Sequence, residues 1–275
     1  MEYRGRIAPS PTGLLHLGHA RTFLIAAERG RGGVLILRNE DLDTQRARPE
    51  FVQAMLEDLH WLGIRWQEGL QLQGEETGSY GPYAQSLRGA LYQDAFERLR
   101  AVGAVFPCAC SRRDLAAVAH APHAEDEDEP LYPGTCRERV AHDGCAWRFR
   151  VPDGDAITFD DGLMGPQTFV AGRDFGDFLV MRRDGVPSYQ LACVVDDDAM
   201  RVTEVVRGRD LLRSTARQIL LQRALGYATP IYAHCSLVVN EQGERLAKRD
   251  AARSLRALRE SGMSAEAVRA LALTS

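Results

Sequence analysis

The chain has 275 residues and a formal net charge of −4, with 34 lysine and arginine residues against 38 aspartate and glutamate residues. Hydrophobic residues make up 45% and charged residues 26% of the chain, which is ordinary for a globular protein of one large or two small domains. No apolar run approaches the roughly 20 residues that cross a bilayer, six cysteines do not make a disulfide scaffold in a chain of this length, and the first residues do not resemble a signal peptide. We therefore expect a cytoplasmic protein.

The first hundred residues alternate between strand and helix patterns. Residues 6–8 predict a short strand, residues 18–29 a helix, and the run Gly-Val-Leu-Ile-Leu at 33–37 a strand that is buried on both faces. Apolar residues then recur at helical spacing over residues 49–63 and 86–102. This alternation predicts an α/β fold with a doubly wound, Rossmann-like parallel sheet.

The pattern changes at about residue 107, where cysteines, histidines and a run of acidic residues replace the helical periodicity. Four short alternating runs follow, at residues 146–151, 156–159, 167–171 and 178–182. We therefore expect residues 107–185 to form a small inserted module with antiparallel strands, which splits the sheet-forming domain into two halves.

Strand and helix patterns then resume, with a strand expected over residues 201–206, a helix over 211–225 and a strand over 231–239. An arginine-rich tail with helical character follows. We expect an α/β domain in two halves, residues 1–106 and residues 186–250. The inserted module occupies residues 107–185, and residues 251–275 form a short helical tail.

Two loops carry residues suited to phosphate chemistry. The loop after the first strand holds His16, Gly18 and His19 in an H-x-G-H pattern at a helix start, where unpaired N–H groups favour an anion. Imidazoles in this place can donate hydrogen bonds to oxygens that gain negative charge. A basic loop at residues 243–249 contains Lys248, the single lysine among the 34 basic residues. A lysine there can neutralise a triphosphate as a compact point charge.

These loops and three further segments resemble the class I aminoacyl-tRNA synthetases, in particular their glutamyl branch. The matching segments are residues 6–21 around the H-x-G-H pattern, Arg-Asn-Glu-Asp-Leu-Asp at 38–43, Asp-Gly-Val-Pro-Ser-Tyr-Gln-Leu-Ala-Cys-Val-Val-Asp-Asp at 184–197 and Val-Arg-Gly-Arg-Asp-Leu-Leu at 206–212. Full glutamyl-tRNA synthetases continue into a large C-terminal anticodon-binding region. We expect no anticodon-binding domain here, so the resemblance favours the short branch of the family, the glutamyl-Q tRNA(Asp) synthetases.

Resemblance to this branch implies an enzyme, an ATP-dependent ligase with a catalytic nucleotide-binding domain in two halves. It would activate L-glutamate with ATP to glutamyl-adenylate without needing tRNA, and then transfer the glutamate to the queuosine base at position 34 of tRNA(Asp). The implied partners are ATP with Mg²⁺, L-glutamate and queuosine-containing tRNA(Asp), with no membrane and no obligate protein partner. Two alternatives stay open: a truncated paralog that charges another acceptor, and a catalytically silent module that binds RNA or glutamate.

The resemblance also implies roles for individual residues in the amino-acid site. Glutamate has two carboxylates and one ammonium group, and Arg6 and Arg207 are the expected partners of the carboxylates because each guanidinium can bind a carboxylate in bidentate fashion. Ser10 would contribute its hydroxyl group, and Tyr189 would supply its hydroxyl at the pocket wall. Glu40 follows a buried strand, which places it at the carboxyl edge of the sheet, where it can accept the ammonium.

The resemblance places ATP against four residues, of which the two histidines and the lysine are the expected catalytic groups: His16, Gly18, His19 and Lys248. The loop around Lys248 departs from the family pattern Lys-Leu-Ser-Lys-Arg, because Arg245 and Ala247 occupy its first and third positions. Arg245 keeps the positive charge, whereas Ala247 lacks a hydroxyl that could contact phosphate.

Cys108 and Cys110, with Cys136 further along the chain, predict a metal knuckle. In the resembled family such a site holds one structural zinc ion with a tyrosine oxygen as the fourth ligand, which here would be Tyr132. From the residues alone, the fourth ligand is drawn more naturally from His120, His123 and Cys145. The other two cysteines, Cys193 and Cys235, lie in apolar runs and are expected in the core.

Overall fold

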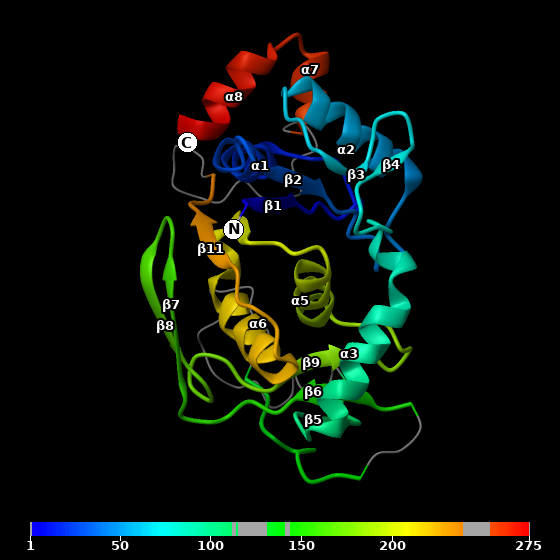
Figure 1. Ribbon diagram of the computed structural model, residues 1–275, viewed down its shortest axis with the longest axis vertical. Helices are drawn as coiled ribbons and strands as arrows, with labels where there is room; N and C mark the ends of the chain where they lie inside the picture. Colours follow the sequence, from blue (N-terminus) through cyan, green and yellow to red (C-terminus); the bar gives the residue numbers. More distant parts are fainter. Residues whose placement is uncertain (1, 112–113, 115–130, 141–143, 239–253, 275) are drawn as a thin grey trace.

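The structure is a computed structural model, which describes the chain except for residues 1, 112–113, 115–130, 141–143, 239–253 and 275 (Figure 1). Its centre is an eight-stranded sheet in the order β4-β3-β2-β1-β10-β11-β7-β8. The six strands from β3 to β7 in this order pair in parallel, and an antiparallel hairpin closes each edge. The strands are β1 (Arg4–Ile7), β2 (Val34–Leu37), β3 (Glu68–Leu70), β4 (Glu76–Thr77), β7 (Ala156–Asp161), β8 (Gly165–Val170), β10 (Glu204–Gly208) and β11 (Ile231–Cys235).

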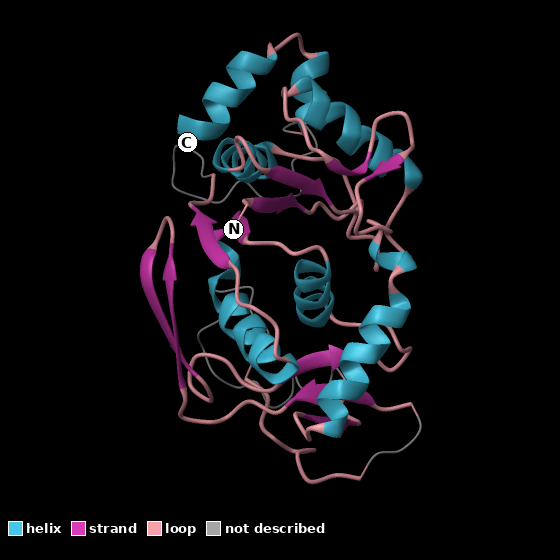
Figure 2. Ribbon diagram, in the orientation of Figure 1, coloured by secondary structure: helices cyan, strands magenta, loops and turns pink. Residues whose placement is uncertain are grey.

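Helices cover both faces of this sheet (Figure 2). One layer contains α1 (Leu17–Arg29), α2 (Pro49–Trp61), α7 (Leu255–Glu260) and α8 (Ala265–Thr274), and the other contains α3 (Gly89–Ala101), α5 (Tyr189–Ala199) and α6 (Leu212–Leu225). Two separate hydrophobic clusters fill the spaces, one around Leu24, Leu37 and Leu59 and the other around Leu191 and Leu221. Single-turn helices η1 (Gln85–Leu87) and η2 (Arg209–Leu211) precede α3 and α6. The expected α/β fold with a parallel sheet is confirmed.

A second, three-stranded antiparallel sheet lies at the far end of α3 (Figure 1). Its strands are β5 (Val105–Cys108), β6 (Ala146–Phe149) and β9 (Phe178–Met181). The hairpin of β7 and β8 comes from the same stretch of chain, yet Asp161 of β7 pairs with Tyr232 of β11 in the large sheet. The segment expected as an inserted module therefore contributes strands to both sheets. None of the helices in the described part of the chain is long and apolar enough to cross a membrane.

The structure also contains elements that the sequence patterns did not predict. Helix α5 is absent from the predicted elements, although Ser188 caps its start by accepting a hydrogen bond from the amide of Leu191 at 3.3 Å. The strand expected over residues 201–206 begins only at Glu204, because Arg201 has a φ of 55° in the turn after α5. The helix expected over residues 86–102 begins at Gly89, after η1.

Candidate active site

A cavity of about 520 Å³ opens at the carboxyl ends of β1 and β10. From β1 the chain leads through α1 to β2 on one side, whereas β10 leads through α6 to β11 on the other, so the strand order reverses between β1 and β10. Open parallel sheets bind ligands at such a switch point, because the two diverging loops leave a crevice there. The cavity wall contains all five residues predicted for the amino-acid site: Arg6, Ser10, Glu40, Tyr189 and Arg207.

The histidines of the H-x-G-H pattern cap the start of α1. His16 is the N-cap residue, and its Nδ1 accepts a hydrogen bond from the Gly18 amide at 3.2 Å, while His19 Nδ1 accepts one from the His16 amide at 3.2 Å. A Cβ atom at Gly18 would lie 3.1 Å from the His16 ring, so a glycine permits this close packing. All three residues line the cavity beside a helix N-terminus, whose dipole favours a bound anion.

Arg6 and Arg207 bring two guanidinium groups into the cavity wall, where their residues are 5% and 4% exposed. Arg6 Nη1 donates to the Val206 carbonyl at 2.9 Å, and Arg6 Nε lies 3.6 Å from Asp197 Oδ1. Arg207 Nη1 is buried and has no hydrogen-bond partner among the described residues. Because an unpaired polar group is costly to bury, the cavity favours a ligand that brings an anionic oxygen to this nitrogen.

Arg207 is held in place by two hydrogen bonds and an aromatic ring. Its Nη2 donates to Thr215 Oγ1 at 2.6 Å, its Nε donates to His234 Nε2 at 3.2 Å, and its guanidinium carbon lies 5.2 Å from the centre of the Tyr232 ring. On its other edge, His234 Nδ1 lies 2.5 Å from Asp161 Oδ2. Burial and the neighbouring Arg207 lower the pKa of His234 to about 4, which keeps its imidazole neutral near pH 7.

Glu40 belongs to a buried network of charges. Arg38 is completely buried, and it donates from Nη2 to Glu40 Oε1 at 2.9 Å and from Nη1 to Asp197 Oδ1 at 2.6 Å. Because Asp197 also faces Arg6, Arg38 and Asp197 together connect Glu40 to Arg6. Cys193 is buried as predicted, and its Sγ donates to Glu40 Oε1 at 3.6 Å. Burial, with Glu40 beside it, raises the pKa of the Cys193 thiol well above its usual range.

The remaining predicted residues lie at the rim of the cavity or outside the described chain. Tyr189 is the first residue of α5 and is 39% exposed, and Ser10 is exposed in the loop after β1. Lys248 falls within residues 239–253, which lie outside the described residues, as do Arg245 and Ala247 of the same loop.

The described chain on either side of residues 239–253 lies beside the cavity. Val238 lines the cavity wall, and Ser254 forms an isolated β-bridge with His16. Next to that bridge, the Leu255 amide donates to the Leu15 carbonyl at 2.8 Å. The tail helix α7 is therefore tied to the H-x-G-H loop at its first residue.

The cysteine cluster lies about the end of β5, in the small sheet. The sulfur atoms of Cys108, Cys110 and Cys136 lie within 4.8 Å of one another. The Tyr132 hydroxyl lies 3.4 Å from Cys108 Sγ and 3.6 Å from Cys110 Sγ, and the sulfurs of Cys110 and Cys136 are 3.6 Å apart. A tetrahedral zinc ion with Zn–S bonds of about 2.3 Å spaces its sulfur ligands roughly 3.8 Å apart, so these donors fit a structural zinc ion.

The alternatives for the fourth ligand do not join this cluster in the described chain. Cys145 is buried just before β6 and is not part of the group of sulfur atoms that the described residues form. His120 and His123 lie within residues 115–130, outside the described residues. The described cluster thus presents three thiols and one phenol.

The family described as tRNA synthetases class I (E and Q), catalytic domain, matches residues 2–273. The chain belongs to this family. It is 49% identical over 275 residues to a glutamyl-Q tRNA(Asp) synthetase of Symbiobacterium thermophilum, a match that covers 96% of this chain and 83% of the relative. It is 48% identical over 273 residues to a protein of the same name from Nitratidesulfovibrio vulgaris, which covers 95% of this chain and 82% of the relative.

Among solved structures, a glutamate-tRNA synthetase from Elizabethkingia anophelis matches with a TM-score of 0.77 and 31% sequence identity. The match covers 91% of this chain but only 53% of that one, so the chain spans about half the length of the solved synthetase. Together with the family match, these relatives confirm the expected class I tRNA synthetase fold and the expected class of ATP-dependent ligase.

Four buried residues in or beside this candidate site were missed by the sequence reasoning: Arg38, Asp161, Asp197 and His234. Arg38 and Asp197 lie inside segments that carry the family resemblance, so their position next to charged site residues was a usable signal. His234 reads as a lone histidine in an apolar strand, and Asp161 belongs to a hairpin distant in sequence. Nothing in the sequence connects these last two to each other or to Arg207.

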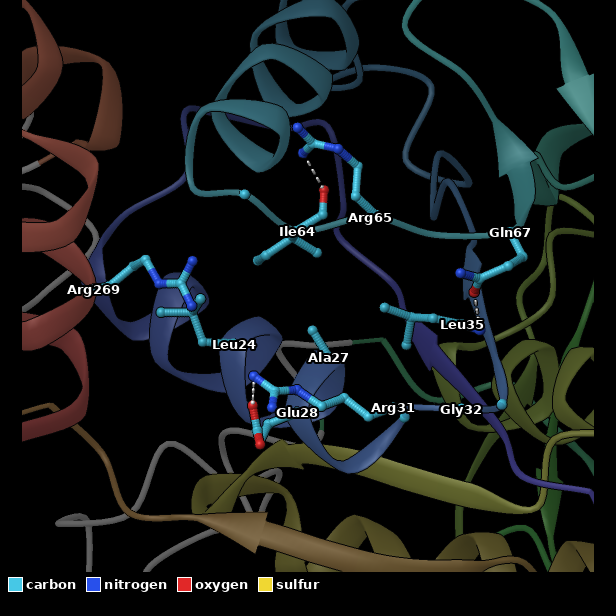
Figure 3. Close-up of a pocket in the computed structure, with 13 residues that line it drawn as sticks. Leu24, Ala27, Glu28, Arg31, Gly32, Leu35, Ile64, Arg65, Gln67 and Arg269 are labelled. Atoms are coloured by element: carbon cyan, nitrogen blue, oxygen red, sulfur yellow. Dashed lines mark hydrogen bonds and ion pairs between the residues drawn. The ribbon is translucent and has the colours of Figure 1, made fainter.

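A second, smaller hollow of about 240 Å³ lies between α1, the turn after α2, and α8 (Figure 3). It contains none of the predicted site residues. Its three arginines are already engaged, since Arg31 pairs with Glu28 at 2.7 Å, Arg65 donates to the Ile64 carbonyl at 3.0 Å and Arg269 donates to the Leu62 carbonyl at 3.2 Å. The cavity at the switch point is therefore the better candidate for the active site.

Proposed function

We propose that this chain activates L-glutamate with ATP to give glutamyl-adenylate, without needing tRNA, and then transfers the glutamate to the queuosine base at position 34 of tRNA(Asp). The observation that carries this proposal is the pairing of Arg6 and Arg207 with Glu40 in one cavity, next to the H-x-G-H helix start. Two cations and one carboxylate complement an amino acid with a second carboxylate. The helix N-terminus beside them suits the phosphates of ATP.

In the first step, a glutamate carboxylate oxygen would attack the α-phosphorus of ATP, which forms the acyl–phosphate bond and releases pyrophosphate with the electron pair of the broken P–O bond. Such a reaction needs positioning and charge stabilisation more than covalent help from the protein. Arg6 and Arg207 would hold the carboxylates, with Ser10 and Tyr189 at the rim, and Glu40 would accept the ammonium.

The phosphate side of the reaction would involve His16, Gly18 and His19 at the start of α1, with Mg²⁺ bound mainly by the ATP phosphates. Lys248 would neutralise the phosphates as pyrophosphate leaves. This role for Lys248 rests on the family resemblance of its loop, because the loop lies outside the described residues.

For the second step, two relatives that are named glutamyl-Q tRNA(Asp) synthetase support tRNA(Asp) as the acceptor, and we propose its queuosine base as the group that receives the glutamate. The other candidate is transfer to the 3′ end of a tRNA for glutamate. The solved glutamate-tRNA synthetase favours this alternative, because it shares the fold of the catalytic region. The two acceptors differ in the atom that receives glutamate, so they are distinguished by where the label appears on the tRNA.

We further propose that residues 1–106 and 186–250 act as the two halves of the catalytic domain and that 107–185 is an insertion whose zinc ion is held by Cys108, Cys110, Tyr132 and Cys136. The pairing of β1 with β10 and the spacing of the sulfur atoms support this division. When bound, the zinc ion would stabilise the small sheet and take no part in the chemistry. Residues 251–275 would form the helical tail.

The test is glutamate-dependent exchange of labelled pyrophosphate into ATP, measured without tRNA and with each amino acid in turn. We expect exchange with L-glutamate and not with L-glutamine, whose amide lacks the second negative charge. Labelled glutamate should then join tRNA(Asp) that contains queuosine and should not join tRNA(Asp) that lacks it. Label on the 3′ end of tRNA(Glu) would instead support the second candidate, and no exchange with any amino acid would refute the activation step.

A further inference from the structure

The Arg207 guanidinium is fixed by partners on two of its three nitrogens. Nη2 is bound to Thr215 and Nε to His234, while Nη1 is buried without a hydrogen-bond partner among the described residues, in a side chain that lines the cavity. A long side chain has many conformers, so a guanidinium that must meet a carboxylate at one place loses affinity if it is not held there. Thr215 and His234, which accept from Nη2 and Nε, therefore together fix how Arg207 presents Nη1.

We propose that Asp161 and His234 are positioning residues, which hold Arg207 in the orientation that binds a carboxylate of the amino-acid substrate. The proposal rests on the proposed function, because it concerns the same amino-acid pocket. Unlike Arg6 and Arg207, neither residue belongs to the wall of the cavity, and both are buried, so we assign them no contact with the substrate itself. They act through the hydrogen bond that His234 Nε2 accepts from Arg207.

That hydrogen bond requires one particular tautomer of His234. Nε2 must carry a lone pair toward Arg207 Nε–H, so the single proton of the neutral ring must be on Nδ1. Nδ1 faces Asp161 Oδ2 at 2.5 Å, and a carboxylate can only accept there. Although burial opposes ionisation, the hydrogen bonds that Asp161 accepts from His234 and from the amides of Leu163 and Met164 lower its pKa, so the carboxylate is ionised.

The other oxygen of Asp161 is equally constrained. Oδ1 accepts from the amides of His234 at 3.0 Å, Leu163 at 3.0 Å and Met164 at 2.9 Å. Because all three are donors, an asparagine at this position must place its carbonyl oxygen there and turn its NH₂ group toward His234 Nδ1. The ring would then have to carry its proton on Nε2, which could donate to Thr215 Oγ1 at 3.0 Å but could no longer accept the hydrogen bond from Arg207 Nε.

The same geometry gives the β7–β8 hairpin a function. Asp161 is the last residue of β7 and pairs with Tyr232, two residues before His234 on β11. The hairpin comes from the middle of the chain and lies at the edge of the large sheet (Figure 1). It thus anchors an amino-acid-binding arginine that belongs to β10, two strands away.

The test compares Asp161→Asn with Asp160→Asn, the same change at the exposed preceding residue, in glutamate-dependent ATP–pyrophosphate exchange. We expect Asp161→Asn to raise KM for glutamate by about 10- to 100-fold, the range for loss of a hydrogen bond to a charged group. KM for ATP should stay within about threefold, and Asp160→Asn should behave as the wild type. An unchanged KM for glutamate in a folded Asp161→Asn protein would overturn the proposal.

A second measurement is independent of activity. Histidine ¹⁵N spectra of the labelled protein distinguish the two neutral tautomers, and the signal of His234 is identified by its loss in His234→Gln. We expect the proton on Nδ1 in the wild type and on Nε2 in Asp161→Asn. If the wild type shows no exchange but the expected tautomers appear, the proposed function fails while the pair stands. If the wild type carries the proton on Nε2, the positioning role is wrong whatever the activity.

Discussion

Replacing Arg38 by methionine tests whether the buried charge network stabilises the proposed amino-acid pocket. Arg38 is completely buried, 2.9 Å from Glu40 and 2.6 Å from Asp197, and its Nε is 3.8 Å from Asp196. Removing one partner of a buried ion pair costs about 3–5 kcal/mol, because the opposite charge stays buried without compensation. Asp196 keeps Arg88 at 2.6 Å, so the cost falls mainly on Glu40 and Asp197.

Urea unfolding measures this cost. With a slope of about 3 kcal/mol per molar urea, a loss of about 3–5 kcal/mol lowers the midpoint by about 1–2 M. The matched control is Arg31→Met, which removes an ion pair with Glu28 whose side chains are 74% and 62% exposed, and it should cost at most about 0.5 kcal/mol. Exchange activity is then measured without urea, at a temperature at which both variants are folded. It should fall for Arg38→Met alone, because Arg38 connects Glu40 to Asp197 and Asp197 faces Arg6.

A double-mutant cycle separates the network from simple loss of packing. Asp197→Asn removes one of the two carboxylates that Arg38 faces most closely. If the two side chains stabilise each other, the double variant should be less destabilised than the sum of the single variants, by about 1–3 kcal/mol. The reasoning would be refuted if Arg38→Met lowered the free energy of unfolding by less than about 1 kcal/mol, or if the effects of the two single variants were strictly additive.

Three further predictions concern other parts of the molecule. Burial raises the pKa of Asp58 from 3.8 to about 6 despite the nearby Arg259, so the folded state favours the protonated form, and its stability falls as pH rises from about 4 through 6. We therefore compare the free energy of unfolding of Asp58→Asn with that of the wild type in urea. After allowance for solvent screening, the difference should shift in favour of Asp58→Asn by about 2 kcal/mol between pH 4 and pH 8. A difference that does not change with pH would contradict this. Metal analysis of the purified protein should find one zinc ion per chain, and none in Cys110→Ser. A wild type without zinc would rule out the proposed ligand set. Lys248→Ala should reduce exchange by about two orders of magnitude or more, by analogy with removing one preorganised charge donor, and should leave the melting temperature unchanged. Near-normal exchange would remove Lys248 from the proposed catalytic groups.

The parts of the site that could be predicted from the sequence lie directly after predicted strands. Arg6, Glu40 and Arg207 each lie on or follow a strand of one parallel sheet, so the edge at which they meet follows from the strand pattern alone. The H-x-G-H loop could be predicted for the same reason, since it joins a strand to a helix start. Local pattern is enough when the fold brings the same end of each strand together.

Helix α5 could not be predicted in the same way. Its sequence from residue 189 contains Leu-Ala-Cys-Val-Val, which is as compatible with a buried strand as with a helix, followed by three aspartates. Two of these aspartates are nearly fully buried, and they are stabilised by arginines from distant segments, Arg88 with Asp196 and Arg38 with Asp197. The helix is therefore stabilised by tertiary charge pairs, which no local propensity reveals.

The pairing of Asp161 with His234 shows the same limit across a longer distance. The two residues are 73 positions apart, and they meet only because β7 lies next to β11 at the edge of the large sheet. The sequence pattern assigned the β7 segment to an inserted module, which gave no reason to place it beside the proposed amino-acid pocket. This contact depends on the order of the strands in space, which a local sequence pattern does not reveal.

The proposed amino-acid pocket needs three distant parts of the chain at once. Arg6 comes from β1, Arg207 from β10, and the two strands pair through Gly5 and Glu204, about 200 residues apart in the sequence. Asp161 comes from the segment between them. Because the Arg207 guanidinium has no described partner on Nη1, it is costly to bury until a ligand binds, and only the completed sheet can hold it there. The binding energy of an anionic substrate would therefore be largest in the fully assembled fold, which predicts that L-glutamate stabilises the wild type against urea more than it stabilises Asp161→Asn.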